Sequence, residues 1–166
     1  MDHLQIEKVF NQQFAGLRVQ MVGGAAEPLY LPATEHAPAR LFYREDYAAS
    51  ALHEAAHWSI AGCRRRLLVD FGYTYIAPPR TTQQQQAFFQ FELRTQSLEA
   101  LFARAAGVAF QVSADNLESP VATFARQVED SIDATWGWVS NSTDQRALQF
   151  YRALERAASA QCLQVG

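Results

Sequence analysis

Residues 46–62 read DYAASALHEAAHWSIAG, and this stretch decides how the chain is expected to fold. Asp46 is a favourable N-cap, the alanines favour a helical interior, and Gly62 favours the end of a helix. These signals predict a helix over residues 47–61. The helix carries two of the chain's four histidines, so it predicts a chemical site as well as an element of structure.

His53 and His57 lie about one turn apart on the same face of the predicted helix. Their imidazole nitrogens can converge on one metal ion at about 2.0–2.1 Å. With Glu54 between them they form the pattern H-E-x-x-H, in which the glutamate can act as general base toward a metal-bound water. The alternative is an ordinary helix face, with one histidine in the core and Glu54 solvated. The ligand spacing of the two histidines favours the metal site.

A catalytic ion held by two histidines needs a third protein ligand and an open coordination position. Glu92, Gln96 and Glu99 follow at i, i+4 and i+7 in a later helical region, so one helix face can carry all three. We predict Glu92 as the third ligand. Glu99 is then the partner of a histidine N–H, or the alternative ligand. The competing interpretation is that both glutamates are solvated.

The composition indicates one globular domain over residues 1–166. The chain is 49% hydrophobic, which is enough for one sizeable core, and its net charge of -3 is not that of a general nucleic-acid-binding protein. Neither a signal peptide nor an apolar run of about 20 residues is visible, so we expect no membrane contact. Cys63 and Cys162 are far apart, which argues against a disulfide framework. We expect a cytoplasmic monomer.

The remaining patterns predict a mixture of helices and strands. Helices are expected over residues 3–14, 121–132 and 143–158, and either two helices or one bent helix over residues 81–106, with Thr95 as a second cap. Strands are expected over residues 17–22, 67–75 and 108–112. Residues 23–40 are rich in Gly, Pro and Ala and predict a long ordered loop. We therefore predict the α+β class, with the histidine helix packed near a small mixed sheet.

Several separated motifs resemble one family. They are GGAAEPLYLPA over residues 23–33, the stretch over residues 47–62, the pair Arg64 and Arg65, DFGY over residues 70–73 and DNL over residues 115–117. In this order they resemble the bacterial elongation factor P hydroxylase family, over about residues 9–154. The resemblance implies an iron-dependent, monooxygenase-type enzyme that hydroxylates the β-lysylated lysine of elongation factor P. It also implies a zincin-like α+β fold, unlike the 2-oxoglutarate oxygenase barrel.

The resemblance carries metal binding onto His53 and His57, and Glu92 and Glu99 match acidic positions of the family. Such a donor set leaves open positions on Fe(2+) for dioxygen as co-substrate. Spare carboxylates can orient the amines of the modified lysine by charge-assisted hydrogen bonds, and tyrosines can line the channel. We predict these substrate-binding residues, for which turn capping or core packing is the alternative: Glu27, Tyr30, Tyr73, Tyr75 and Asp115.

Two features depart from the family's pattern. Residues 73–80, YTYIAPPR, lack an expected Asp-Gly pair, and Phe89 stands where a glutamate is usual, so the pocket rim is expected to differ here. The basic run of residues 64–66 can complement the helix dipole, which we favour, or contact an acidic partner surface.

Two other functions stay open. One is a zinc metallopeptidase, with Zn(2+) in place of iron and Glu54 activating water, and the motif alone would place it first. The other is a noncatalytic binding module stabilised by a metal.

Overall fold

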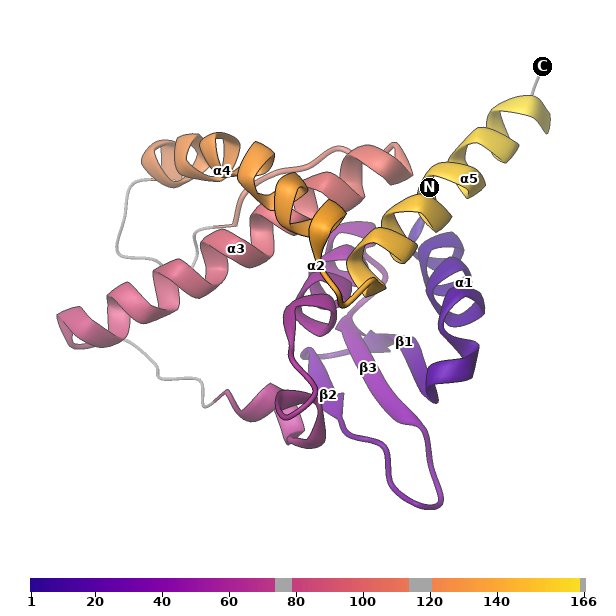
Figure 1. The fold of residues 1–166 in the computed structure, drawn as a ribbon, viewed down its shortest axis with the longest axis horizontal. Coiled ribbons are helices and arrows are strands. Elements are labelled where there is room, and N and C mark those ends of the chain that lie inside the picture. The colour runs from indigo at the N-terminus through magenta and orange to yellow at the C-terminus, as the bar shows by residue number, and fades with distance from the viewer. Residues whose placement is uncertain (74–78, 114–120, 165–166) are drawn as a thin grey trace.

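The chain forms five α-helices and a three-stranded sheet in the computed structural model, which describes residues 1–73, 79–113 and 121–164 (Figure 1). The helices and strands are α1 (His3–Gln13), β1 (Val19–Ala25), β2 (Leu29–Leu31), β3 (Ala39–Arg44), α2 (Ala48–Ile60), α3 (Thr82–Ala106), α4 (Val121–Asn141) and α5 (Arg146–Gln164). Short 3-10 helices lie at η1 (Ala15–Leu17), η2 (Arg65–Leu67) and η3 (Val69–Gly72). The predicted α+β class is confirmed. None of the helices in the described ranges is both long and apolar enough to cross a membrane.

The sheet has the order β1-β3-β2, with β3 parallel to β1 and antiparallel to β2. Alternate residues of β1 and β3 are buried: Val19 and Met21 in β1, and Ala39, Leu41 and Tyr43 in β3. This period-two pattern is that of a sheet with one face on the core and the other toward solvent. Helix α1 packs against β1 and α2 against β3, so the histidine helix lies directly on the sheet.

A cluster of aromatic side chains joins four helices at the centre of the core. The ring centroids of Phe10, in α1, and of Phe14, at its C-cap, lie 5.2 and 4.7 Å from that of Trp58 in α2. Phe150 of α5 lies 5.4 Å from Phe10 and 5.0 Å from Phe102 of α3. Each such ring contributes roughly 1.5–3 kcal/mol of burial free energy, and aromatic pairs add about 0.5–1.5 kcal/mol. The cluster therefore holds α2 firmly between its neighbours.

The C-terminus of α2 is held by arginine side chains. Arg146, at the start of α5, is buried and donates to the carbonyl oxygens of three residues at this end: Trp58, Ser59 and Ala61. Arg66 donates to the Ala61 carbonyl as well. Asp144 accepts from Arg146 at 2.6 and 2.7 Å and completes the arrangement. Arg66, from the basic run of residues 64–66, thus bonds to the C-terminal end of α2. Most of the hydrogen bonds there come from Arg146, which is distant in sequence.

The predicted N-cap of the histidine helix is wrong. Helix α2 begins at Ala48 and its N-cap is Tyr47, with no side-chain hydrogen bond to the helix. The carboxylate of Asp46 lies instead 3.8 Å from Nδ1 of His3, in α1. A contact with a distant helix has replaced the local cap.

The strand predicted over residues 67–75 is also wrong in its described part, which forms η2 and η3. Asp70 and Phe71 have φ angles of 48° and 57°, in the left-handed region, and an extended strand cannot contain them. Tyr30 supplies the reason: its backbone N–H donates to the Asp70 carboxylate at 2.8 Å, and its ring stacks on Phe71 at 4.2 Å. These contacts with a residue distant in sequence outweigh the alternation of apolar and polar residues that predicted a strand.

Other boundaries differ from prediction in simpler ways. Residues 108–113 form no strand, and the loop predicted over residues 23–40 contains the end of β1, all of β2 and the start of β3. Residues 82–106 form the single helix α3, capped by Thr81, so Thr95 lies inside a helix and caps none. Helix α4 extends nine residues beyond the predicted end, from residue 132 to 141.

Candidate metal centre

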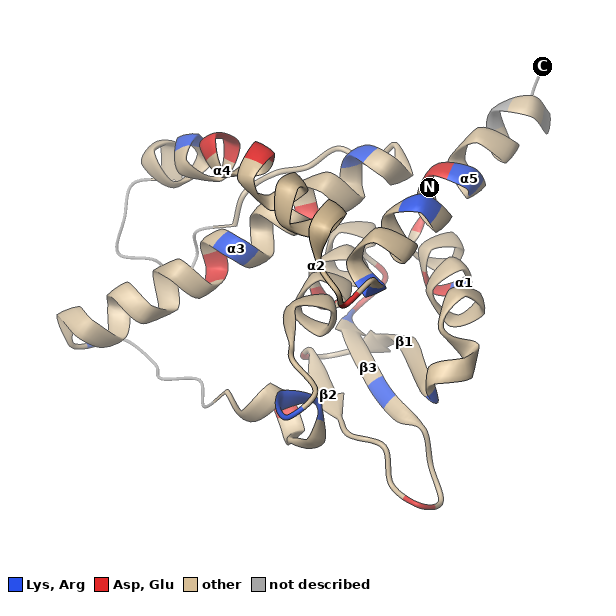
Figure 2. Ribbon diagram, in the orientation of Figure 1, with Lys and Arg blue, Asp and Glu red and all other residues tan. Residues whose placement is uncertain are grey.

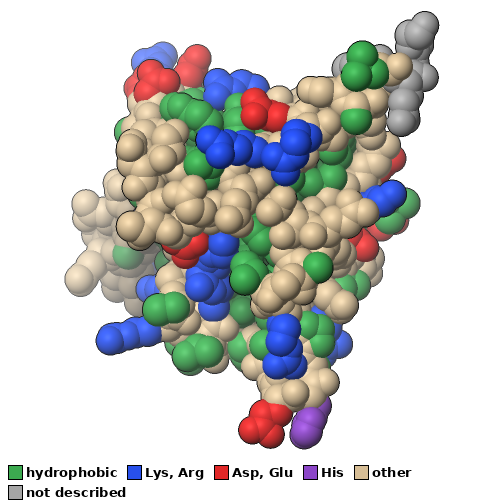
Figure 3. Space-filling model, turned by 45° about the vertical axis from the view of Figure 1, so that its right-hand side comes forward, with side chains coloured by type: hydrophobic (Ala, Val, Ile, Leu, Met, Phe, Trp, Pro, Cys, Tyr) green, Lys and Arg blue, Asp and Glu red, His purple; other side chains and the backbone are tan. Residues whose placement is uncertain are grey.

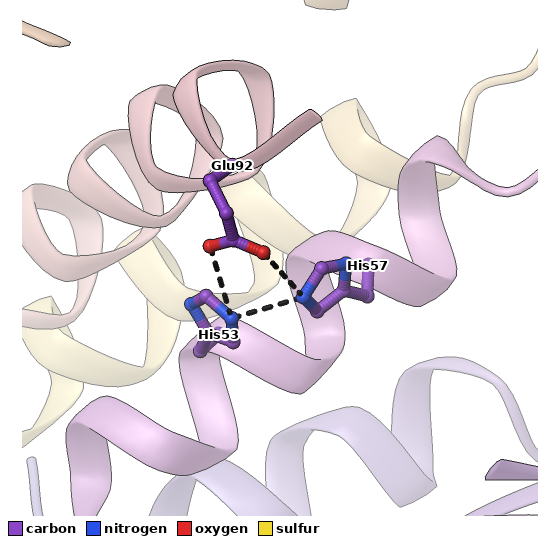
Figure 4. A group of neighbouring side chains, drawn as sticks. All are labelled: His53, His57 and Glu92. Carbon is purple, nitrogen blue, oxygen red and sulfur yellow. Dashed lines mark hydrogen bonds and ion pairs between the residues drawn. The ribbon is translucent and has the colours of Figure 1, made fainter. Parts of the chain in front are cut away.

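Helices α2 and α3 pack together and bring to one point three side chains that could hold a metal ion, which we call the ligand group (Figure 4). The Nε2 atoms of His53 and His57 lie 2.9 Å apart. Each of them lies 3.9 Å from a different carboxylate oxygen of Glu92. Neighbouring ligands of an octahedral ion, each at about 2.1 Å, lie roughly 3 Å apart, so the two nitrogens already have a spacing that one ion can use. This His/His/carboxylate group fits a first-row transition metal such as iron or zinc.

Glu99 lies on the other side of the His53 ring from Glu92. Its Oε2 is 2.8 Å from Nδ1 of His53, and its side chain is buried. A carboxylate that accepts from Nδ1–H holds the ring in place and leaves Nε2 directed at the metal position. The structure therefore places Glu92 with His53 and His57 in the group that could hold a metal ion, and Glu99 on the other nitrogen of the His53 ring.

His57 is oriented in the same way by a hydroxyl group. Thr95 donates its hydroxyl hydrogen to the carbonyl of Phe91 at 3.0 Å, so its Oγ1, 3.4 Å from Nδ1 of His57, can accept from that ring. The ring of Phe91 stacks on His57 at 4.9 Å. The sequence interpretation missed this role of Thr95. Its position three residues after Glu92 and four before Glu99 was the available signal, because that spacing belongs to one helix face.

Gln96 ties Glu92 to the segment after α3. Its amide nitrogen donates to Oε2 of Glu92 at 3.2 Å and to the Ser113 carbonyl at 2.8 Å, and its amide oxygen accepts from the Ser113 backbone N–H at 3.0 Å. Because Gln96 is buried, these bonds are shielded from water. One face of α3 thus supplies the carboxylate and the groups that orient all three ligand side chains.

The two histidines have opposite pKa shifts. Burial lowers the pKa of His53, but the hydrogen bond and charge of Glu99, with the charges of Glu92 and Glu54, outweigh it and raise this pKa to about 9. Burial, and then the charge of His53, hold the pKa of His57 well below its ordinary value. In the metal-free chain His53 is therefore the protonated ring, and its Nε2–H donates to Nε2 of His57. An ion held by both nitrogens would take the place of that proton.

Glu54 lies beside the ligand group and is buried. Burial raises the pKa of its carboxyl group, the charge of His53 lowers it, and nearby carboxylates raise it further, to about 7. A carboxyl group with such a pKa can hold or release a proton near neutral pH.

A family model described as Elongation factor P hydroxylase matches residues 7–165. The chain belongs to the elongation factor P hydroxylase family. One relative, the elongation factor P lysine hydroxylase of Haemophilus influenzae, is 42% identical over 111 residues, which are 66% of this chain and 62% of the relative. The matched segment thus spans less than two thirds of that hydroxylase.

In this member of the elongation factor P hydroxylase family, the ligand group opens into a pocket of 1020 Å³. Its lining includes the three ligand side chains, Glu54, and three of the predicted substrate-binding residues: Glu27, Tyr30 and Tyr73. The other two, Tyr75 and Asp115, lie outside the described residues. Arg65, Asp70 and Arg80 also line the pocket and were not among the predicted substrate-binding residues. Aromatic side chains from η3 and α3 form much of the remaining wall: Phe71, Phe88 and Phe91.

Two side chains of this elongation factor P hydroxylase family member have structural contacts that sequence could not show. The hydroxyl of Tyr30 donates to the Arg66 carbonyl at 2.9 Å and its ring is buried, so Tyr30 builds the pocket wall. Phe89, at the position where the family usually has glutamate, lies 5.2 Å from the ring of Phe124 in α4 and is outside the pocket lining. This departure therefore changes the packing of α3 on α4 instead of the pocket rim.

Proposed function

We propose that this chain hydroxylates the β-lysylated lysine of elongation factor P, using one Fe(2+) ion and dioxygen. The observation that carries the proposal is the convergence of His53, His57 and Glu92 at a pocket, in a chain of this family. Two imidazoles and one carboxylate are the donor set of non-haem iron oxygenases. We infer that residues 1–166 act as one domain, as a monomer, in the cytoplasm where translation factors work.

The proposed reaction replaces a C–H bond of the substrate by C–OH. One oxygen atom of dioxygen enters the product and the other leaves as water, so two electrons and two protons must come from a donor outside the chain. When bound, iron supplies the activation of dioxygen. The chain's own groups hold the ligands in place: Glu99 orients His53, Thr95 orients His57, and Gln96 orients Glu92.

The pocket side chains fit a substrate with positive amines. Glu27 and Glu54 provide carboxyl groups in the lining, and a carboxylate binds an ammonium group by charge-assisted hydrogen bonds. We propose Glu54 also as the group that holds or releases a proton beside the metal position, which its pKa of about 7 allows. Tyr73 lines the pocket with its ring 3.8 Å from that of Phe91, so the two rings together form part of the aromatic wall of the site.

A zinc-dependent hydrolase is the second candidate function. Glu54 favours it, because a carboxyl group next to two histidine ligands can activate metal-bound water for amide cleavage. The packing of α2 on β3 supports a zincin-like arrangement, which either function can use.

Mass spectrometry of elongation factor P separates the two functions. The purified chain is loaded with Fe(2+) and incubated with β-lysylated elongation factor P, dioxygen and a reductant. We expect a mass increase of one oxygen atom on the modified lysine, and its loss in His53→Ala and His57→Ala. A preparation that contains stoichiometric zinc, cleaves peptides and consumes no oxygen would be a hydrolase and would end the proposal of hydroxylation.

A further inference from the structure

Three consecutive apolar side chains project from the segment after α2. Leu67, Leu68 and Val69 have 74%, 51% and 52% of their surfaces exposed, and we refer to them as the apolar knuckle. Isolated exposed apolar residues are common on proteins, whereas contiguous exposed apolar groups are a feature of interaction sites. Among the described residues, the other large exposed hydrophobics are separate from one another in sequence.

The backbone conformation of the knuckle is held by specific contacts. Asp70 and Phe71 adopt the left-handed conformation, which is unfavourable for residues with a Cβ atom. The Asp70 carboxylate accepts from the backbone N–H of Tyr30, and Arg65 donates to the Phe71 carbonyl at 3.3 Å. Unfavourable backbone that is fixed by its surroundings is concentrated at functional sites. Here its effect is to turn the chain so that the knuckle faces solvent.

The knuckle is continuous with the rim of the pocket. Arg65, Asp70 and Phe71, which flank it on both sides, line the pocket that contains the metal ligands. Arg64 and Arg65 are exposed beside it, and Figure 2 shows basic positions grouped at this turn next to β2. On the face in Figure 3, several Lys and Arg side chains lie in groups beside hydrophobic and acidic side chains. An apolar centre with basic neighbours complements an apolar surface that carries carboxylates.

We propose that the apolar knuckle is the docking surface for the folded body of the protein substrate. This inference rests on the proposed function, because a lysine carried by a protein reaches the pocket only when that protein covers part of the rim. The occupant is a surface of the substrate protein near its modified lysine, with apolar side chains that contact Leu67, Leu68 and Val69. Acidic side chains around them pair with Arg64.

Binding and turnover of β-lysylated elongation factor P test the docking surface. In the variant L67S/L68S/V69S we expect binding about tenfold weaker and a KM higher by a similar factor, with iron content and kcat at saturation unchanged. R64E should weaken binding in a way that diminishes as salt is raised. The matched control is Leu4→Ser: Leu4 is 62% exposed but lies on α1, which packs on β1, whereas η3 packs on β2 at the opposite edge of the sheet.

The outcomes distinguish docking from the proposed function. If the native chain hydroxylates elongation factor P and the triple variant binds it equally well, docking is elsewhere and the inference is overturned. An equal loss in Leu4→Ser would overturn it too, because the effect would not belong to the knuckle.

If sedimentation shows that the native chain is a dimer and the triple variant a monomer, the occupant is a second copy. Should the triple variant fail to fold, Leu67→Ser alone, at the most exposed position, gives the same readouts. A native chain that neither binds nor hydroxylates the factor contradicts both proposals.

Discussion

His53 lies between two carboxylates that contact different nitrogens of its ring. A carboxylate oxygen of Glu92 lies 3.9 Å from Nε2 of His53, which also faces the nitrogen of His57. Glu99 bonds instead to Nδ1 of His53 at 2.8 Å. Sequence periodicity predicted that both glutamates face the histidines, because seven residues are close to two turns of a helix. The orientation of the His53 ring gives Glu92 and Glu99 different roles, and this orientation cannot be predicted from a sequence pattern.

Replacement of each glutamate by glutamine measures these roles. Glu99→Gln should lower metal affinity by about 10–100-fold, since it weakens the support of a ligand. Glu92→Gln should lower it further, because a charged ligand is lost. Metal titration of both variants checks the order. If Glu99→Gln has the larger effect, Glu99 is the third ligand and Glu92 the supporting group.

Thr95→Val tests the support of the second histidine. The variant keeps the shape of Thr95 but removes the hydroxyl that faces Nδ1 of His57, and we expect metal affinity about tenfold lower. The matched control is Ser97→Ala. Ser97 is buried in the same helix and donates to the Leu93 carbonyl four residues earlier, as Thr95 does to Phe91. A comparable loss of affinity in Ser97→Ala would mean that the effect comes from the helix and not from the hydroxyl near His57.

Among the elements, the sequence correctly predicted the helices whose caps and buried faces depend on residues close by in the chain. Thr81 caps α3 with a reciprocal bond to Gln84, and the apolar spacing over residues 3–14 predicted α1, whose buried residues are Ile6 and Phe10. The turn at residues 65–72 was mispredicted because its conformation depends on Tyr30, more than 30 residues earlier. The ends of α2 likewise depend on partners distant in sequence, which composition and spacing do not reveal.

The ion pair of Asp144 with Arg146 at the C-terminal end of α2 makes the folding stability depend on pH. Burial raises the pKa of Asp144, but its hydrogen bonds and ion pair with Arg146, and the charge of Arg66, outweigh it and lower this pKa below its ordinary value of 3.8. The folded chain therefore binds this proton more weakly than the unfolded chain. The stabilisation is complete above pH 3.8 and is lost as pH falls through the lower folded value.

Urea unfolding at pH 7 and pH 3 checks this dependence. We expect Asp144→Asn to reduce the free energy of unfolding at pH 7 by about 1 kcal/mol, since the side chain is 40% exposed and its ion pair is partly screened. The loss between pH 7 and pH 3 should be smaller in the variant than in the native chain. Asp133→Asn, on α4 and exposed, serves as control. Equal pH dependence in the native chain and Asp144→Asn would contradict the assignment.

At the scale of the whole molecule, the ligand group connects the helix on the sheet to the longest helix. His53 and His57 belong to α2, whereas Glu92 belongs to α3 (Figure 4). An ion bound here links two elements that come together only in the folded chain, so binding must stabilise the fold.

Anaerobic thermal unfolding with Fe(2+) or Zn(2+) measures this linkage. At a free metal concentration of about 100 times Kd, the gain should be about 2.7 kcal/mol, and a chelator should reverse it. His57→Ala should show no gain, while His36→Ala, in the exposed loop before β3, should behave like the native chain. A gain of the same size in His57→Ala would place the ion at another site.

Helix α3 passes from solvent into the core along its length. Glutamines fill its exposed first turns, and almost every residue from Thr95 to Ala106 is buried. Glu92 precedes this boundary and Glu99 follows it. Helices open from their less protected end, so an opening of α3 that starts at Thr82 would reach Glu92 before it reaches Glu99, which contacts His53. A metal ion held by His53, His57 and Glu92 would then lose its carboxylate before its two imidazoles.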